Sequence, residues 1–354
     1  MAEHEARDPR EVRVALVGIG AWGRNLARNY AQMPGAELRW ICDRDPRRLA
    51  DASRNFPHAM CTPDYARVLA DPELDAVVIA ASAVAHFALA RQALMAGKDV
   101  YVEKPLVLDV ADGEELIRLA AERNRILMVG HLLEYHPVVL KLRDMIRAGE
   151  LGRVLYVYSQ RLNLGTVRQD ENALWSLAPH DISSILFMLD QLPTDVSARG
   201  QCYVQRGIED VVFMNMDFGG QAMAHIHVSW LDPHKIRRIT VVGSKRMAVF
   251  DDAEGSEKLR IYDKGAHLPD EYDTYAASTG LRFGDITIPY FKATEPLRLE
   301  CQHFLECVRT RAQPVSDGHD GLRVVKVLEA AQRSLKSNGE PLPIDLSGPP
   351  RVAA

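Results

Sequence analysis

Residues 12–23 read VRVALVGIGAWG, and this stretch decides how the first half of the chain folds. The run VRVALV has the length and apolarity of a buried parallel strand, and it stops at a glycine. The pattern G-x-G-x-x-G follows directly, and helical spacing of apolar residues then begins. A glycine turn between a strand and a helix lets the backbone approach a pyrophosphate and directs free N–H groups at it. We therefore expect a dinucleotide to contact Gly18, Ile19, Gly20, Ala21, Trp22 and Gly23.

Beyond this turn, strand-like and helical segments alternate regularly. Such alternation predicts right-handed crossovers and a doubly wound parallel sheet of the Rossmann type. We place this dinucleotide-binding domain at residues 12–135, after a polar arm at 1–11. Its further strands are expected at 38–42, 76–80, 100–102 and 126–130, and its helices at 22–33, from 46, at 83–96 and at 110–123.

After a helix at 136–148 the pattern changes to shorter alternation between turn signals, which is typical of an antiparallel sheet. We expect an α+β domain with a largely antiparallel sheet at residues 136–340, which binds substrate and forms a homo-oligomer, and an extended tail at 341–354. An apolar face left open on the sheet is the reason to expect the oligomer. Its strands are predicted at 154–162, 210–218, 222–230, 236–243, 247–252 and 258–263, with helices at 179–189, 296–311 and 319–336.

The composition excludes several classes of protein. Lys and Arg number 43 against 48 Asp and Glu, so the net charge of −5 gives no general attraction for DNA or RNA. The five cysteines form no CxxC pair, which favours reduced thiols in the cytoplasm. The most apolar stretch, residues 76–90, is shorter than the roughly 20 residues that a membrane span needs. We expect a cytoplasmic protein with neither nucleic acid nor membrane as a partner.

Asp43 follows the second predicted strand, 20 residues beyond the third glycine of the turn. A carboxylate there accepts hydrogen bonds from the adenosine ribose hydroxyls and repels a 2′-phosphate, which favours NAD over NADP. Arg44 lies beside it and could instead accommodate such a phosphate. Asp43 could also be an ordinary turn residue before Asp45 and Pro46.

Glu103, Lys104 and Pro105 follow the strand-like VYV and so lie at the carboxyl edge, where doubly wound sheets bind ligands. The glycine turn together with AGKDVYVEKPL at residues 96–106 resembles the Gfo/Idh/MocA family of oxidoreductases. That resemblance implies a nicotinamide-dependent dehydrogenase of a sugar-like polyol, with Lys104 near the nicotinamide and the reacting hydroxyl.

A second family motif reads Asp-x-x-x-His, and the matching segment here is WSLAPHD at residues 175–181. His180 fits the histidine, but Ser176 stands where the family usually has Asp. Histidine titrates near neutral pH and can take a hydroxyl proton, while a nearby ammonium favours the developing alkoxide. We therefore predict His180 as the general base and Lys104 as the alkoxide stabiliser. His180 could also be a structural residue beside Pro179 in the first turn of a helix.

Further cofactor contacts are expected from Ser82, His86, Glu103 and Lys104. The family pattern A-T-P-x-x-x-H would give His86 its place, but the segment here reads AASAVAH, so helix burial is an equally good interpretation. His225 and His227 alternate on one strand without a third ligand, so no metal is predicted.

The segments RLNLG at 161–165 and ENALWSLAPHDIS at 171–183 are similar to family members that act on nucleotide-activated amino sugars. This similarity implies oxidation of the 3-hydroxyl of UDP-N-acetylglucosamine, or a related sugar, to a keto sugar. A free aldose, inositol or another polyol is the alternative substrate, and a nucleotide-binding sensor without turnover is the alternative class. The expected substrate contacts are Lys104, Arg161, Asn163, Arg168, Ser176 and His180, with Arg237 and Arg238 as further partners for a diphosphate.

Overall fold

In its described residues the chain builds two large sheets, each at the centre of one compact unit, and a small two-stranded sheet. The computed structural model describes residues 11–165, 167–266 and 280–344. The first unit runs to Leu132 and includes Thr294–Val325, and the second contains Leu133–Ala293 and, of the described residues, Lys326–Ile344. Two predicted segments lie mostly outside the described residues. They are the polar arm at 1–11, of which residue 11 is described, and the extended tail at 341–354, of which residues 341–344 are described.

The first unit contains the expected parallel sheet, and the fold class is confirmed. Within the described residues six strands lie in the order β3-β2-β1-β4-β5-β6, and every neighbouring pair is parallel. The chain order reverses between β1 and β4, which is where a doubly wound sheet binds its ligand. The elements are β1 (Val12–Val17), α1 (Ala21–Gln32), β2 (Ala36–Cys42), α2 (Pro46–Asn55), β3 (Met60–Thr62), α3 (Tyr65–Leu69), β4 (Ala76–Ile79), the 3-10 turn η1 (Ala83–Ala85), α4 (His86–Met95), β5 (Asp99–Glu103), α5 (Val110–Arg123) and β6 (Leu127–Gly130).

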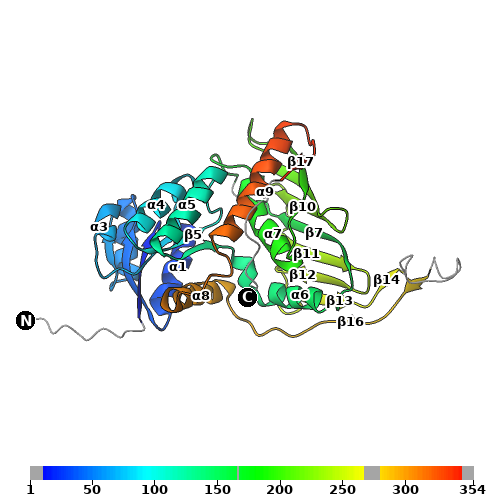
Figure 1. Ribbon diagram of the computed structural model, residues 1–354, viewed down its shortest axis with the longest axis horizontal. Helices are drawn as coiled ribbons and strands as arrows, with labels where there is room; N and C mark the ends of the chain where they lie inside the picture. Colours follow the sequence, from blue (N-terminus) through cyan, green and yellow to red (C-terminus); the bar gives the residue numbers. More distant parts are fainter. Residues whose placement is uncertain (1–10, 166, 267–279, 345–354) are drawn as a thin grey trace, which may run out of the picture. The chain divides into compact units, whose positions relative to one another are not determined.

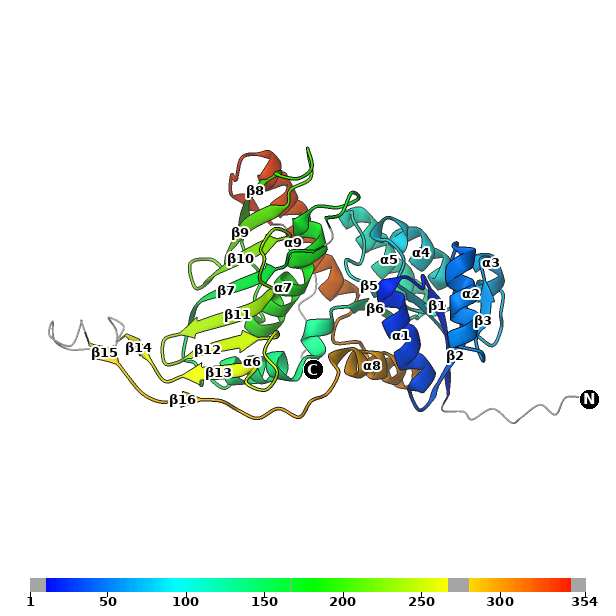
Figure 2. The same ribbon diagram turned by 180° about the vertical axis from the view of Figure 1, so that it is seen from behind.

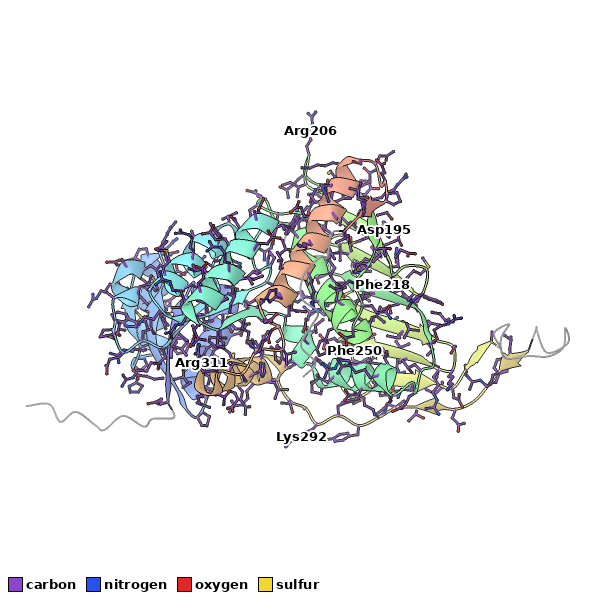
Figure 3. All side chains as sticks on the ribbon, in the orientation of Figure 1. Asp195, Arg206, Phe218, Phe250, Lys292 and Arg311 are labelled. Carbon is purple, nitrogen blue, oxygen red and sulfur yellow. The ribbon has the colours of Figure 1, made fainter. Side chains whose placement is uncertain are left out.

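Helices cover both faces of this sheet because right-handed crossovers in opposite directions from its centre leave on opposite sides. Figure 1 shows α1 and α8 (Pro296–Thr310) on one face, and α4 and α5 on the other. The expected second domain included α8, but this helix packs against α1 in the first unit. Arg311, labelled in Figure 3, follows α8 and forms a two-pronged ion pair with Asp99 of β5, with N···O distances of 2.6 and 3.0 Å.

The second unit contains the largely antiparallel sheet. In the part of the chain that the structure describes, nine strands lie in the order β16-β13-β12-β11-β7-β10-β9-β8-β17, and Figure 2 shows the run from β9 to β13. One neighbouring pair, β7 with β10, is parallel. The elements are η2 (Leu132–Tyr135, beginning one residue before the unit), α6 (Pro137–Arg147), β7 (Val154–Leu162), α7 (Ala173–Leu189), β8 (Asp195–Gln201), β9 (Val211–Asp217), β10 (Met223–Ser229), β11 (Ile236–Gly243), β12 (Met247–Asp251), β13 (Leu259–Tyr262), β14 (Gly265–Ala266), β15 (Leu281–Arg282), β16 (Ile286–Thr287) and β17 (Leu342–Pro343); α9 (Gly318–Lys336) begins in the first unit and ends in this one.

Helices α6 and α7 pack on one face of the large sheet (Figure 2). Phe250 of β12, labelled in Figure 3, is buried on that face and packs against His136 with ring centroids 4.8 Å apart. Along β9 and β10, buried residues alternate with more exposed ones, so the described residues of the unit leave the other face of these strands uncovered. Within the described ranges, each helix is too short or too polar to cross a lipid bilayer.

The prediction for α7 was wrong about where the helix begins. It starts at Ala173 rather than Pro179, because Asn172 caps it by accepting a hydrogen bond from the Trp175 N–H. Pro179 therefore lies inside the helix, where its missing N–H leaves the Trp175 carbonyl without the usual helical donor. The expected segments also omitted α3, β3, β8 and β14 to β17, whose strands are short or polar.

Candidate active site

The turn between β1 and α1 has the geometry that a dinucleotide requires. Gly18 has a φ of +93°, which glycine adopts readily, and a side chain at Gly23 would meet the Gly18 carbonyl oxygen at 2.0 Å. A Cβ at Gly20 would meet only the Arg48 guanidinium, 3.7 Å away, so the backbone there remains accessible. Gly20 is also the N-cap residue of α1, whose first N–H groups are available to an anion. These residues fit the pyrophosphate of a dinucleotide.

Asp43 lies at the end of β2 and is tied to the same turn. One carboxylate oxygen accepts the Ile19 N–H at 2.8 Å, and the other accepts the Asp45 N–H at 2.9 Å. Arg48 approaches the first oxygen to 3.6 Å, whereas Arg44 is exposed. A carboxylate has about four acceptor positions, so Asp43 can hold the turn and still accept hydrogen bonds from a ribose. The two interpretations of Asp43 are therefore compatible.

Replacing Asp43 with alanine should weaken NAD binding roughly 10- to 100-fold, the effect of losing charge-assisted hydrogen bonds. NADP should lose much less affinity, because the same change removes a charge that repels its 2′-phosphate. Calorimetry with each cofactor measures the difference. Asp45→Ala is the matched control, since the Asp45 side chain caps α2 through the Arg47 N–H and pairs with Arg47 and Arg48 of that helix. Equal affinity of the unaltered protein for both cofactors would contradict this role.

Lys104 follows the last residue of β5, at the carboxyl edge of the sheet. Its side chain is half-buried, and its peptide bond to Pro105 is cis. Glu103, next to it, is buried and accepts hydrogen bonds at 2.5 Å from the Trp22 indole, at 3.1 Å from the Tyr101 hydroxyl and at 3.3 Å from the Lys104 N–H. Burial raises the pKa of the Glu103 carboxyl above its usual range, although these hydrogen bonds and the Lys104 charge oppose the shift. The structure thus brings the glycine turn and the lysine segment together at one carboxylate.

His86 is the first residue of α4 and is 1% exposed. Its Nδ1 lies 2.8 Å from the Pro105 carbonyl and its Nε2 lies 3.1 Å from the Ala81 carbonyl. Burial lowers the pKa of this imidazole, and a neutral ring can donate to one of the two oxygens. His86 therefore lies between the loops after β4 and β5, while Ser82, in the first of these loops, is exposed.

In the second unit, α7 carries the other expected groups. His180 is half-buried, and its carbonyl accepts the Ser184 hydroxyl at 2.7 Å. Ser176, one turn earlier, is 7% exposed. The start of the helix is fixed by Asn172, whose amide donates to Glu209 at 2.7 Å and to Gln332 at 2.9 Å.

The residue that the sequence analysis missed on this helix is Asp181. Its carboxylate is 1% exposed and accepts a two-pronged ion pair from Arg161 of β7, at 2.6 and 3.3 Å, and a hydrogen bond from Ser159. Arg161 thus pairs with a carboxylate that is next to His180 in the sequence, and Arg168 pairs with Glu171 at 3.0 Å. Asn163 is exposed in the loop after β7. The two-residue period of a strand puts Val157, Ser159 and Arg161 on one face of β7, but the sequence VLYVYSQRL does not mark that face as the covered one.

Comparison with known proteins decides the family. Residues 12–131 match a family described as an oxidoreductase family with an NAD-binding Rossmann fold, and residues 139–249 match the GFO/IDH/MocA C-terminal domain. The chain belongs to the Gfo/Idh/MocA family of oxidoreductases. This Gfo/Idh/MocA protein is accordingly an NAD-binding dehydrogenase that acts on a CH–OH group, and the family resemblance seen in the sequence is confirmed.

Two relatives align over nearly the whole of this Gfo/Idh/MocA protein. UDP-N-acetylglucosamine 3-dehydrogenase from Acidithiobacillus ferrooxidans is 29% identical over 315 residues, which are 89% of this chain and 94% of that one. Its solved structure, GnnA, has a TM-score of 0.77 at 25% identity and covers 92% of this chain and 98% of its own. The scyllo-inositol 2-dehydrogenase of Bacillus subtilis is 28% identical, covering 95% and 97% of the two chains.

Proposed function

We propose that this protein oxidises the 3-hydroxyl of UDP-N-acetylglucosamine, or a closely related UDP-amino sugar, to a keto sugar with NAD as the oxidant. The observation that carries this proposal is the end-to-end similarity, in sequence and in fold, to a UDP-N-acetylglucosamine 3-dehydrogenase. A separate relative oxidises scyllo-inositol, so a free polyol is the second candidate substrate.

The proposed chemistry needs one base and one cation at the reacting hydroxyl. NAD, when bound, accepts the hydride from the sugar carbon. We assign removal of the hydroxyl proton to the His180 imidazole and stabilisation of the developing alkoxide to the Lys104 ammonium. The half-burial of both side chains supports these roles, because a partly dry environment strengthens an ammonium–alkoxide interaction. Glu103, Ser82 and the glycine turn are assigned to NAD, and Ser176 to the sugar.

The diphosphate of the substrate is assigned to arginines on β7 and β11. Arg161 and Arg237 lie directly opposite one another in the antiparallel register, and side chains in such positions are about 5 Å apart at Cβ. Arg161 pairs with Asp181 at 2.6 Å, and Arg237 pairs with Asp252 at 3.6 Å. Each guanidinium charge is therefore neutralised by a carboxylate in the structure without substrate. A diphosphate can share guanidinium groups that already have one partner, since each carries five N–H donors. Asn163 and Arg168, in the loop after β7, are further candidates.

A panel of sugars tests the proposed substrate. The protein is incubated with NAD and, separately, UDP-N-acetylglucosamine, UDP-glucose, myo-inositol, scyllo-inositol and glucose, and NADH formation is followed by absorbance. We expect kcat/KM for UDP-N-acetylglucosamine to exceed that for the free polyols by at least about 100-fold, the value of one or two lost charge-assisted contacts. A higher kcat/KM for an inositol would replace the proposed substrate with the second candidate.

We also propose that the uncovered face of the large sheet pairs with a second copy of the chain. Tyr156, Phe213 and Met223 are 42%, 45% and 53% exposed on adjacent strands of that face. Phe213 stacks on His227 with ring centroids 4.3 Å apart, which extends this apolar surface. An apolar patch of this kind on a sheet is typical of a subunit interface.

Replacing Phe213 with lysine should dissociate this oligomer, because it places a charge in an apolar contact. Sedimentation of the unaltered protein at micromolar concentration is expected to give a multiple of the single-chain mass, and the variant is expected to give the single chain. Tyr203→Lys is the control, since Tyr203 is 71% exposed in the connection between β8 and β9. A single-chain mass for the unaltered protein would refute the interface.

A further inference from the structure

Glu103 is the meeting point of two segments that the sequence separates by 81 residues. Its Oε1 accepts the indole N–H of Trp22, in the middle of the glycine turn, at 2.5 Å. The same oxygen accepts the Tyr101 hydroxyl at 3.1 Å, and Oε2 accepts the Lys104 N–H at 3.3 Å. Three donors from three residues therefore converge on one buried carboxylate.

The surrounding sheet leaves room for this arrangement. Gly130 of β6 is the register partner of Glu103, and a Cβ there would meet the Tyr101 hydroxyl at 2.7 Å and the Glu103 Oε2 at 3.0 Å. Tyr101 itself is fully buried and packs edge-on against Phe304 of α8. Neither tyrosine nor carboxylate can move far without displacing a neighbour, so the position of the carboxylate is fixed by packing and by its donors.

Trp22 differs from Tyr101 in its exposure. Trp22 is 40% exposed, although its indole N–H is engaged with a buried group. The exposed part of the ring belongs to the turn that faces the dinucleotide, because Trp22 lies between Gly20 and Gly23. A cofactor at this turn would thus act on a side chain that is hydrogen-bonded to Glu103.

We propose that Trp22 and Tyr101 are positioning residues, which hold the Glu103 carboxylate between the NAD-binding turn and the backbone of Lys104. Trp22 links the carboxylate to the cofactor, and Tyr101 anchors it to the core of the sheet. The consequence for Lys104 rests on the catalytic role proposed for that residue above, whereas the consequence for NAD binding does not.

The pH dependence of NAD binding distinguishes this role from simple packing. Desolvation raises the pKa of Glu103, and the hydrogen bonds from Trp22 and Tyr101 lower it. The other titratable groups that act on this cluster are Lys104, Tyr30 of α1, and Glu300 and Cys301 of α8. Removing either donor raises the pKa further, so the carboxylate is protonated at a higher pH. On this proposal the charged carboxylate is the form that holds the NAD-binding turn in place, so NAD affinity should be lost at a higher pH as the pH falls.

The experiment measures NAD affinity by calorimetry from pH 5 to pH 9 in Trp22→Phe and Tyr101→Phe. The acid midpoint is the pH at which half of the NAD affinity is lost on acidification. Each variant should shift this midpoint upward by about one pH unit, the effect of one hydrogen bond to a charged group. Matched controls lose the same atoms elsewhere in the first unit: Trp40→Phe removes an indole bond to Asp71, and Tyr65→Phe removes a hydroxyl bond to the Leu89 carbonyl. These controls should keep the midpoint of the unaltered protein.

Glu103→Gln provides the decisive background. This variant should bind NAD with little dependence on pH, and adding Trp22→Phe or Tyr101→Phe should then leave the pH dependence of NAD binding unchanged.

Tyr101→Phe should also lower turnover of the best sugar roughly five-fold with an unchanged sugar KM, as misplacement of a catalytic group does. The proposal would be overturned if Trp22→Phe and Tyr101→Phe left the acid midpoint of NAD binding unchanged. It would also be overturned if either substitution had the same effect on NAD binding in the Glu103→Gln background as in the unaltered protein. If no sugar in the panel is oxidised, the proposed function fails, but the NAD measurements still decide this inference.

Discussion

Lys104→Ala is expected to lower turnover by at least about 100-fold and to leave NAD affinity within about three-fold of the unaltered value. The reason is that an ammonium at the reacting hydroxyl acts on charge that develops only in the transition state, so its loss affects kcat and kcat/KM rather than cofactor binding. NADH absorbance measures the first quantity and calorimetry with NAD alone measures the second.

Lys98→Ala is the matched control for this loss. Lys98 belongs to the same unit and is buried, and its ammonium donates to the carbonyls of Asp71 and Leu74, both at 2.8 Å. Its removal should lower the stability of the unit while turnover per folded molecule persists. A Lys104→Ala protein that retains more than about a tenth of the turnover would exclude Lys104 from the chemical step.

His180→Ala is expected to lower turnover by a similar factor, within the 10²- to 10⁴-fold range of general acid–base catalysis. The unaltered enzyme should become faster as pH rises through the range in which imidazole loses its proton, because only the neutral ring can accept the hydroxyl proton. This limb of the pH profile should be absent from the residual activity of His180→Ala. His234→Ala, which alters an exposed histidine of the same unit, should keep both the rate and the limb.

The double variant tests whether the two groups act on one proton. If Lys104 and His180 serve the same transition state, removing both should cost much less than the product of the two single losses. Losses that multiply would indicate that the residues act in separate steps.

The fold could be predicted where glycine, proline and apolar runs mark the chain. Gly18 stops β1, Pro46 starts α2, and α5 has the predicted bounds at Val110 and Arg123. The helix α3, with five residues, is too short to show periodicity, and the strand β8, which reads DVSARGQ, carries too few apolar residues. Pro179 was interpreted as a helix start because proline favours the first turn, and burial of fourteen α7 side chains outweighs that preference.

The site could be predicted only as separate pieces. Sequence spacing places Lys104 at a strand end and the glycines in a turn, because these are local patterns. The bond from Trp22 to Glu103 depends on the strand order β1-β4-β5, and the pair between Arg161 and Asp181 depends on which face of β7 lies against α7. Contacts of this kind follow from tertiary packing, which no short segment of sequence determines.

Transfer of the hydrogen from sugar carbon 3 to NAD is the central claim, and isotopic labelling measures it directly. The protein is incubated with NAD and UDP-N-acetylglucosamine carrying deuterium at carbon 3, and the NADH and the sugar product are analysed by mass spectrometry. The account predicts one deuterium in each NADH, a keto sugar without the label, and a slower reaction than with the unlabelled sugar. NADH without deuterium, or label retained in an oxidised sugar, would show that another position reacts and would contradict the account.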